Sequence, residues 1–435
     1  MATVSRRTVL VAAGGLVAAA AAGCSANGSG TGGGDSGGST TVKVTMANHV
    51  WTENVKKAIP DFEKASGLKI EITQLAEDQL SDQYNVKLNA GTSEIDVMMY
   101  RPLQEGLLFA QNKYLADLTS KAKGDSTWDL SDFQPAPIAA TTYQNKVVGV
   151  PIITEREVLY YRKDLLQKAG LSVPTTLDEL QAAAQKIKAA NPDIAGFVAR
   201  TGKSPAVTQF SSFLYSMGGD WVDSAGKAAV NSDAAKKAYA LYGGLIKNFG
   251  PANVSTDMSW PEAMAIFTQG KAAFYTEADS LYKNATDTAK SKVADTVGFA
   301  VFPAGPAGSK PYNIPSWALG VNDASKNQAN AWKFIQWATS KDQTMAQQKG
   351  GVPGARASVW AAPEGTSTYP KDLAAAIAAS TKGGVNHDRP VVAQVVKARE
   401  AVGQPIVDAV KGNDLNASVE AAAKAFQAVL DSDKK

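Results

Sequence analysis

The feature that most restricts the fold of this chain is a regular alternation of strand-like and helix-like segments that begins at Thr41. In the first segment Val42, Val44 and Met46 alternate with polar residues, which is the pattern of a half-buried strand. The predicted elements are strand 41–46, helix 53–66 with Gly67 as its stop, strand 68–72, helix at about 78–90 and strand 95–100. Strands that alternate with helices predict an α/β layer with a parallel sheet.

Similar signals recur later in the chain. They are a capping box at Thr176-x-x-Glu179 that opens a helix, a helix end at Asn191-Pro192, strands at 297–302 and 317–321, and a capping box at Ser325-x-x-Gln328 that opens another helix. A chain of 435 residues is too long for one ordinary core, so we expect two lobes.

Between these two regions lies the sequence GVPIITEREVLYYRKDLLQKAG, from Gly149 to Gly170. Glu155, Arg156 and Glu157 interrupt two apolar runs that resemble buried strands. A solvated turn between two strands would explain these charges, and so would a functional site that both apolar runs hold in place. The residues alone leave both interpretations open.

The first 23 residues resemble an export signal that is not part of the fold. Arg6-Arg7 precedes a short apolar run, which is typical of the twin-arginine type of signal. The run ends in Ala21-Ala22-Gly23-Cys24, which resembles a bacterial lipobox, so we expect Cys24 to be lipidated and to become the mature N-terminus. The alternative is a spare cysteine in a signal that is cleaved elsewhere.

Residues 24–40 predict a flexible tether. The sixteen residues from Ser25 to Thr40 include seven glycines and no large apolar side chain, so they cannot bury a core. Their Gly28-x-Gly30-x-x-Gly33 pattern matches a dinucleotide fingerprint only formally, because no strand precedes it and no helix follows. A lipid, a tether and a globular body describe a surface protein anchored to a membrane.

The composition excludes several classes of function. Beyond the first 23 residues the chain has 42 basic and 41 acidic side chains, so nucleic acid is a poor candidate partner. One cysteine and two histidines form neither an internal disulfide nor a Cys/His zinc cluster. The sequence has no P-loop and no Gly-x-Ser-x-Gly elbow, and we expect no cofactor. A glycoside hydrolase stays open, because Glu155 with Glu277 or Asp279 would supply its two carboxylates.

Several segments, in this order, resemble the extracellular solute-binding proteins of bacterial carbohydrate ABC importers, the maltose-binding-protein-like family. The stretch from Gly149 to Gly170, followed by VPTTLDEL, is the most specific of them. The others are DVMMYRPLQEGLLFAQNKYLADL, MAIFTQGKAAFYTEADS, ALGVNDASKNQANAWKFIQWATSKD, GVPGARASVW and RPVVAQVVKAREAVGQPIVDAVKG. The resemblance covers nearly everything from Thr41 to the end of the chain.

The resemblance implies an α/β fold of the type II periplasmic-binding-protein kind, in which two lobes hold the ligand in a cleft between them. The chain would cross between the lobes near residues 152–154, 302–303 and 350–353. The expected limits are 41–152 and 303–349 for the first lobe, and 153–302 and 350–435 for the second. A ligand that contacts both lobes would stabilise a closed form, and the permease would recognise that form.

The resemblance also implies where the ligand lies. Glu155 occupies the position of the family's P-x-x-x-E carboxylate, which accepts hydrogen bonds from sugar hydroxyls. Trp51 offers a flat apolar face for a pyranose ring, and Trp317 is a second candidate because Ser280 stands where the family often has a tryptophan. The other expected contacts follow predicted strands or lie in return segments: Asn48, His49, Tyr100, Arg101, Arg156, Asp220, Glu277, Asp279, Arg356 and His387.

These candidates carry both signs of charge, which suits a neutral sugar or polyol, and a charged solute such as a sugar acid is the alternative. We expect a monomer without catalytic activity and without a metal site, on the outer face of the bacterial cytoplasmic membrane. The expected partners are a small carbohydrate, the transmembrane subunits of an ABC permease, and the membrane itself through Cys24.

Overall fold

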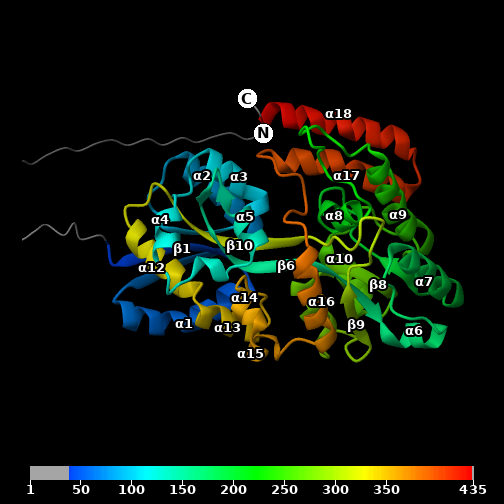
Figure 1. Ribbon diagram of the computed structural model, residues 1–435, viewed down its shortest axis with the longest axis horizontal. Coiled ribbons are helices and arrows are strands. Elements are labelled where there is room, and N and C mark those ends of the chain that lie inside the picture. The colour runs from blue at the N-terminus through cyan, green and yellow to red at the C-terminus, as the bar shows by residue number, and fades with distance from the viewer. Residues whose placement is uncertain (1–38, 434–435) are drawn as a thin grey trace, which may run out of the picture. The chain divides into compact units, whose positions relative to one another are not determined.

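The computed structural model describes residues 39–433, so the predicted signal and Cys24 lie outside the described part of the chain. Within it the strands form a mixed sheet of order β2-β1-β3-β10-β6-β8-β7, with β9 paired to β6 (Figure 1). A separate hairpin joins β4 (Thr142–Tyr143) to β5 (Lys146–Val147). Helices cover the sheet on both faces, and the mixed α/β class is confirmed.

The part built on β1, β2, β3 and β10 is called the first lobe. β1 (Thr41–Ala47) pairs in parallel with β2 (Lys69–Leu75) and β3 (Val97–Tyr100), as the alternating pattern predicts. β10 (Asn313–Val321) joins β3 as an antiparallel strand. The helices of this part are α1 (Val50–Ser66), α2 (Glu77–Asn89), η1 (Pro102–Gly106), α3 (Leu107–Gln111), α4 (Thr119–Gly124), η2 (Leu130–Asp132), α5 (Pro135–Ala140), α12 (Gln328–Ala338), α13 (Lys341–Lys349), α14 (Ala357–Ala361) and α15 (Pro363–Thr366).

The second lobe is built on the C-terminal half of β6 (Val150–Arg162). This half pairs in the antiparallel sense with β8 (Ala272–Ala278) and β9 (Val297–Val301), and β7 (Ala195–Val198) runs parallel to β8. The helices of this lobe are α6 (Lys163–Ala169), α7 (Leu177–Ala190), α8 (Ala206–Ser216), α9 (Asp233–Phe249), α10 (Trp260–Thr268), η3 (Asp279–Leu281), α11 (Tyr282–Thr286), α16 (Lys371–Gly383), α17 (Val395–Lys411) and α18 (Leu415–Asp433).

One strand, β6, belongs to both lobes (Figure 1). It pairs with β10 as far as Arg156, which lies opposite Asn313, and it pairs with β8 from Glu157 onward. The change of partner therefore falls inside the charged triplet that the sequence places between two apolar runs. A solvated turn is the wrong explanation, because the strand continues through these residues and both Arg156 and Glu157 are fully buried.

The second crossing differs from the expected one at residues 302–303. After β9 the chain stays bonded to the second lobe, where the Ala304 amide donates to the Thr175 carbonyl at 2.8 Å and the Tyr312 amide donates to the Ser212 hydroxyl at 3.1 Å. It meets the first lobe only at β10, where Asn313 lies opposite Arg156. The two crossing segments thus lie side by side as paired strands.

The third crossing also lies later than the expected position at residues 350–353. Val352 and Ala355 pack into the core of the first lobe, and the Thr154 amide donates to the Pro353 carbonyl at 2.9 Å. Tyr369 and Leu373 belong to a core cluster of the second lobe, and Trp360 of α14 already packs against the same cluster. The segment that follows α13 therefore stays in the core of the first lobe as far as Ala355, and α14 contacts both lobes, through the bond of the Ser358 amide to Asp132 and through the packing of Trp360.

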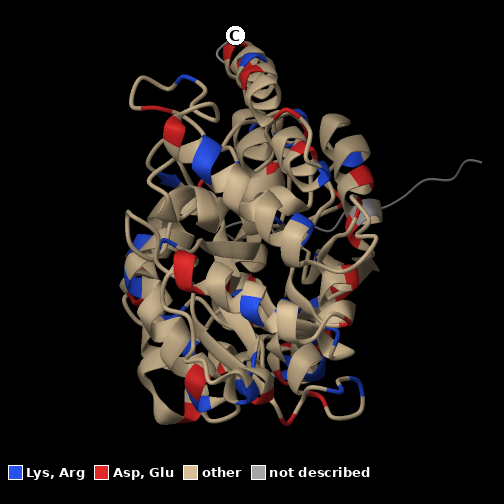
Figure 2. Ribbon diagram, turned by 90° about the vertical axis from the view of Figure 1, so that its right-hand side faces the viewer, with Lys and Arg blue, Asp and Glu red and all other residues tan. Residues whose placement is uncertain are grey.

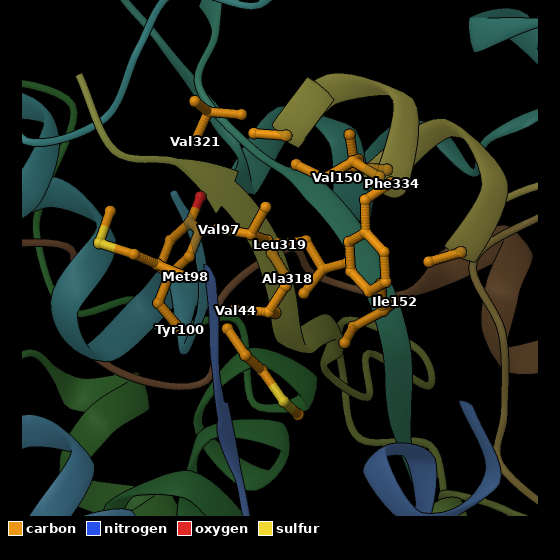
Figure 3. Close-up of a cluster of buried hydrophobic side chains, with 14 of the residues drawn as sticks. Val44, Val97, Met98, Tyr100, Val150, Ile152, Ala318, Leu319, Val321 and Phe334 are labelled. Atoms are coloured by element: carbon orange, nitrogen blue, oxygen red, sulfur yellow. The ribbon is translucent and has the colours of Figure 1, made fainter. Parts of the chain in front are cut away.

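The first lobe has one core and the second lobe has two, one on each face of its strands. Figure 3 shows the core of the first lobe, in which Val97, Met98 and Tyr100 from β3 face Ala318 and Leu319 from β10. In the second lobe the alternation of β6 sends Leu159 and Tyr161 to one cluster, and Val158 and Tyr160 to the other. A strand buried on both faces explains why its sequence is apolar almost throughout.

Local signals explain several of the helix ends. Thr176 caps α7 by accepting from the Glu179 amide at 3.2 Å, and Gly67 ends α1 with φ of 72°. The capping box expected at Ser325 is wrong, because α12 begins at Gln328 after Asn327. The Ser325 hydroxyl instead donates to Asp96 Oδ1 at 2.5 Å, a buried bond that ties this loop to the start of β3.

The surface carries no large block of one charge on the face shown in Figure 2, where segments of both signs are interspersed. This distribution agrees with the near balance of acidic and basic residues. Among residues 39–433, none of the helices has the length and apolar character needed to cross a membrane.

Candidate functional site

Glu155 lies on β6 next to the point where this strand leaves the first lobe. Its Oε1 accepts a 2.8 Å hydrogen bond from the hydroxyl of Ser280 in η3. Burial raises the pKa of Glu155 to about 7, and the charges of Asp279 and Glu277 act in the same direction. The carboxyl group therefore changes its charge near neutral pH. It lies at the junction of the two lobes.

Glu277 is a buried carboxylate held by an arginine. Arg200 Nε donates to its Oε2 at 2.8 Å, Arg200 Nη2 donates to its Oε1 at 2.5 Å, and the Tyr275 hydroxyl donates to Oε2 at 2.7 Å. Such a two-pronged ion pair fixes the geometry of both groups. Glu277 is thus committed to Arg200 and acts on Glu155 through its charge.

Asp279 is committed in the same way to Arg156. Arg156 Nε donates to Asp279 Oδ2 at 2.9 Å, and the Arg156 amide donates to Oδ1 at 3.0 Å. The guanidinium also donates to Thr154 Oγ1 at 2.8 Å and lies 5.0 Å from the ring of Trp360. Both charged side chains are fully buried, so this pair ties β6 to η3 at the crossing.

Glu157 is the third member of the charged triplet and is fully buried. Ser212 and Thr276 of the second lobe lie beside its carboxyl group. Burial raises the pKa of Glu157 well above its usual range, which favours the protonated form of this carboxyl group.

The first lobe contributes His49, Trp317 and Arg101 to the same region. The rings of His49 and Trp317 are 6.3 Å apart, and the Arg101 guanidinium lies 5.8 Å from the Trp317 ring. Trp317 is paired with Ile153 on β6, two residues before Glu155. Adjacent strands therefore place this group next to the candidate carboxylate.

His49 is the N-cap of α1, and its Nδ1 accepts a 3.0 Å hydrogen bond from the Trp51 amide. Burial lowers the pKa of His49 to about 4, so the ring is neutral. A neutral imidazole whose Nδ1 accepts carries its proton on Nε2. His49 can therefore offer one N–H donor to a ligand hydroxyl.

Arg101 follows β3 and is held by acidic neighbours of its own lobe. It forms an ion pair with Glu105, a 3.1 Å ion pair with Glu77, and a 2.8 Å hydrogen bond to the Ser81 hydroxyl. These contacts fix the guanidinium over the ring of Trp317. Arg101 is therefore a positioned donor next to an aromatic ring.

The other candidates of the first lobe lie elsewhere. Trp51 and Tyr100 are buried in its core, and Figure 3 shows Tyr100 among those apolar side chains. Asn48 is exposed, and its amide donates to the Leu75 carbonyl at 2.7 Å. Arg356 is fully buried over the Phe133 ring and pairs with Asp132 at 3.1 Å.

Asp220 and His387 form a pair in the second lobe. His387 Nε2 lies 3.2 Å from Asp220 Oδ1, and the imidazole ring packs edge-on against Tyr215 at 5.2 Å. Asp220 also accepts from the Trp221 amide at 2.6 Å. The structure thus brings these two candidates together with each other, and Glu155 is not among their contacts.

Several polar residues around Glu155 or between the lobes were not candidates from the sequence: Gln104, Arg200, Ser280, Ser316, Arg389 and Arg399. Arg200 was detectable, because it follows β7 as Arg101 follows β3. The Ser316 hydroxyl is buried, and among the described residues it has no hydrogen-bond partner. A buried hydroxyl without a partner next to Trp317 marks a place where a ligand or water is expected to bind.

The arrangement does not resemble a hydrolytic pair of carboxylates. Glu277 and Asp279, the two expected partners of Glu155, are each bound to a buried arginine. Within residues 39–433 there is also no group of three or more His, Cys, Asp or Glu side chains placed to hold a metal ion. The site therefore offers hydrogen bonding and an aromatic face between two lobes, which defines a binding protein of the two-lobed α/β class.

Comparison with known proteins gives the family. Residues 48–345 match the model of the bacterial extracellular solute-binding proteins, and the chain belongs to this family. A probable ABC transporter-binding protein of Deinococcus radiodurans is 32% identical over 304 residues, which is 67% of this chain and 70% of that protein.

Two solved structures agree over most of the chain. A solute-binding protein of Agrobacterium radiobacter K84 in complex with ribitol has a TM-score of 0.77 and 27% identity, and the match covers 89% of this chain and 98% of that one. Maltose-bound MalE3 of T. maritima also has a TM-score of 0.77 and 27% identity, over 88% and 99% of the two chains. The two-lobed periplasmic-binding-protein fold is thereby confirmed, and the chain is an exported solute-binding component of an ABC transporter.

Proposed function

We propose that this protein binds a neutral sugar or polyol between its lobes and delivers it to an ABC importer. The observation that carries the proposal is the position of Glu155 on the strand shared by both lobes, beside Ser280 and close to Trp317. A carboxylate accepts hydrogen bonds from several hydroxyls, and an indole ring packs against the C–H face of a sugar. The similar structures with ribitol and maltose support this class of ligand.

The proposed binding residues are those that surround Glu155. His49 supplies a neutral N–H donor, Arg101 a guanidinium held beside Trp317, and Ser316 a buried hydroxyl. Acidic and basic groups of the site are largely paired with one another, which favours a neutral ligand over a charged one. A ligand that contacts both lobes would stabilise the closed form of the protein.

The lobe limits proposed from the contacts are residues 41–155 and 313–366 for the first lobe, and 157–312 and 369–433 for the second. Hinge motion would then bend β6 and β10 where they run side by side, together with the segment before Tyr369. Short extended segments of this kind absorb a domain rotation through a few backbone dihedral angles.

The remaining parts of the proposal concern the rest of the protein. Cys24 would carry a lipid that anchors the protein to the outer face of the cytoplasmic membrane, with residues 25–40 as a tether. The protein would act as a monomer without catalytic activity of its own. Its partners would be the ligand and the transmembrane subunits of the permease.

A thermal-shift screen of the chain from Ser39 to its end, which forms one compact unit, tests the function. Sugars, alditols and sugar acids are compared at equal concentration. A ligand present at about a hundred times its Kd adds about 2.7 kcal/mol to stability and raises Tm by a few degrees. A shift with sugar acids alone would favour a charged solute, and release of product from a glycoside would contradict a pure binding function.

A further inference from the structure

Gln104 of the first lobe is held by two arginines of the second lobe. Its Oε1 accepts from Arg389 Nη1 at 2.7 Å and lies 3.4 Å from Arg399 Nη1. Gln104 belongs to η1, which directly follows Arg101, and Arg399 lies on α17. This group is a hydrogen-bonded bridge across the interlobe space, here called the Gln104 bridge.

The two arginines are fixed before they reach Gln104. Arg389 pairs with the buried carboxylate of Asp388, and Arg399 Nη2 donates to the Ser204 carbonyl at 2.6 Å. Thr208 Oγ1 lies 3.3 Å from a nitrogen of each guanidinium. Because both cations are oriented by their own lobe, the Gln104 bridge closes without further ordering of these side chains.

A second bridge lies at the other end of the same region. Lys283 of α11, in the second lobe, donates from Nζ to the Gly350 carbonyl at 2.6 Å. Gly350 follows α13 of the first lobe, and Gln347 of that helix donates to the Trp51 carbonyl at 3.0 Å. This contact is called the Lys283 bridge.

The first-lobe wall between the two bridges is short. Beyond the Lys283 bridge it continues from Trp51 to His49, whose Nδ1 accepts from the Trp51 amide, and then to Trp317. The Arg101 guanidinium lies over the Trp317 ring, and the Gln104 amide donates to the Arg101 carbonyl at 3.0 Å. Four side chains, those of Gln347, His49, Trp317 and Arg101, therefore connect one bridge to the other along the first lobe.

The opposite wall is equally short. Lys283 lies one helical turn after Ser280, which is bonded to Glu155. Toward the Gln104 bridge, Glu277 binds Arg200, and the Arg200 amide donates at 2.7 Å to Gln209, the residue after Thr208. Glu155 therefore lies within a series of contacts that runs from one interlobe bridge to the other.

We infer that the two bridges limit the ligand to a single short polyhydroxy unit, an alditol or a monosaccharide, and exclude oligosaccharides. A longer ligand has to pass between Gln104 and Arg389 or between Lys283 and Gly350, and it then replaces the hydrogen bonds that hold the lobes together. The inference rests on the function proposed above and narrows its ligand class.

Calorimetric titration of the full described unit with ribitol, D-mannitol, maltose and maltotriose tests the inference. We expect at least one alditol to bind, and maltotriose to bind at least a hundredfold more weakly. Maltotriose that binds as tightly as the alditols would overturn the size limit and leave the proposed function intact. Absence of binding by all four compounds, and by the wider sugar screen, would overturn the proposed function and the inference with it.

Two variants test the cause of the limit. Gln104→Ala and Lys283→Met each remove one bridge, and we expect each to raise the affinity for maltotriose relative to the best alditol by about tenfold. Lys290→Met is the matched control, because this exposed lysine of the second lobe forms an ion pair with Asp287 of its own turn. If the affinity for maltotriose relative to the best alditol is unchanged in both variants, the bridges are not the cause of the size limit. If a variant does not fold, the ligand series on the unmodified chain still tests the size limit itself.

Discussion

The hydroxyl of Ser280 donates a 2.8 Å hydrogen bond to Glu155, the carboxylate on the strand that both lobes share. In the sequence, Ser280 stands where the family often has a tryptophan. The structure shows that the substitution does not leave the position without a role, because Ser280 orients the proposed ligand acceptor. Trp317, on the neighbouring strand of the first lobe, is the residue proposed to supply the aromatic surface.

Glu155→Ala is expected to weaken ligand binding about ten- to a hundredfold, because it removes a charge-assisted acceptor for ligand hydroxyls. Calorimetric titration with the best ligand from the screen measures the effect. Glu364→Ala is the control, since this glutamate is exposed on α15. Unchanged affinity in a folded Glu155 variant would remove this residue from the binding site.

Glu155→Gln is expected to change how stability depends on pH. The pKa of Glu155 is raised from 4.5 to about 7 in the folded protein, so its protonated form favours the fold. This contribution is fully present below pH 4.5 and is lost as pH rises through 7, by about 3 kcal/mol in all. Urea unfolding between pH 4.5 and 8 should show the glutamine variant gaining stability relative to the unmodified chain as pH rises. Parallel curves would contradict the burial of this carboxyl group.

Arg356→Met is expected to destabilise the protein by about 3–5 kcal/mol without changing ligand affinity more than about twofold. The substitution leaves the buried Asp132 without its cation and frees the carbonyls of Thr339 and Trp128. Urea unfolding and titration separate the two effects. Loss of affinity at unchanged stability would instead place Arg356 in the site.

Trp51→Ala and Trp317→Ala are expected to differ in kind. Both side chains belong to the core of the first lobe, so the loss of either should cost about 3–5 kcal/mol of stability. Trp317 faces His49 and Arg101, and its loss should also lower ligand affinity about tenfold. Tm in the absence of ligand and Kd at a temperature where both variants are folded distinguish them. A larger loss of affinity in the Trp51 variant would reverse the assignment.

Cys24→Ser is expected to release the protein from the membrane into the medium, because a serine cannot take up the thioether-linked lipid. Fractionation of cells that produce the two forms measures the distribution, with a cytoplasmic marker as the control for lysis. A variant that stays with the membrane fraction would contradict the lipid anchor.

The alternation of apolar residues was sufficient to predict β1, β2 and β3 and their parallel order, because each strand of this layer is local in the chain. The crossings were harder to predict. The segment from Phe302 to Tyr312 is bonded to Thr175 and Ser212 of the second lobe, and no pattern within the segment announces those distant partners. The same holds for Val352 and Ala355, whose burial depends on the core of the first lobe.

The site was predictable only in part, for a physical reason. Glu155 was recognisable because a charged residue inside an apolar strand needs an explanation. The sequence does not tell which carboxylate has an arginine partner, so Glu277 and Asp279 could not be distinguished from Glu155 before the contacts of Arg200 and Arg156 were known. The Gln104 bridge joins residues that are far apart in the chain, and a single sequence carries no signal for such a contact.

The pairing of β3 with β10 has a consequence for how the protein is made. Tyr100 lies opposite Ala318, so the ribosome has to synthesise the part of the second lobe that precedes β10 before the first lobe can complete its sheet. Until then β3 has unpaired backbone groups and an apolar surface, which are the features that aggregate or recruit chaperones. Contacts of such long range also slow folding. Newly made chains should therefore spend a measurable time as an incomplete, protease-sensitive intermediate whose final step is the insertion of β10.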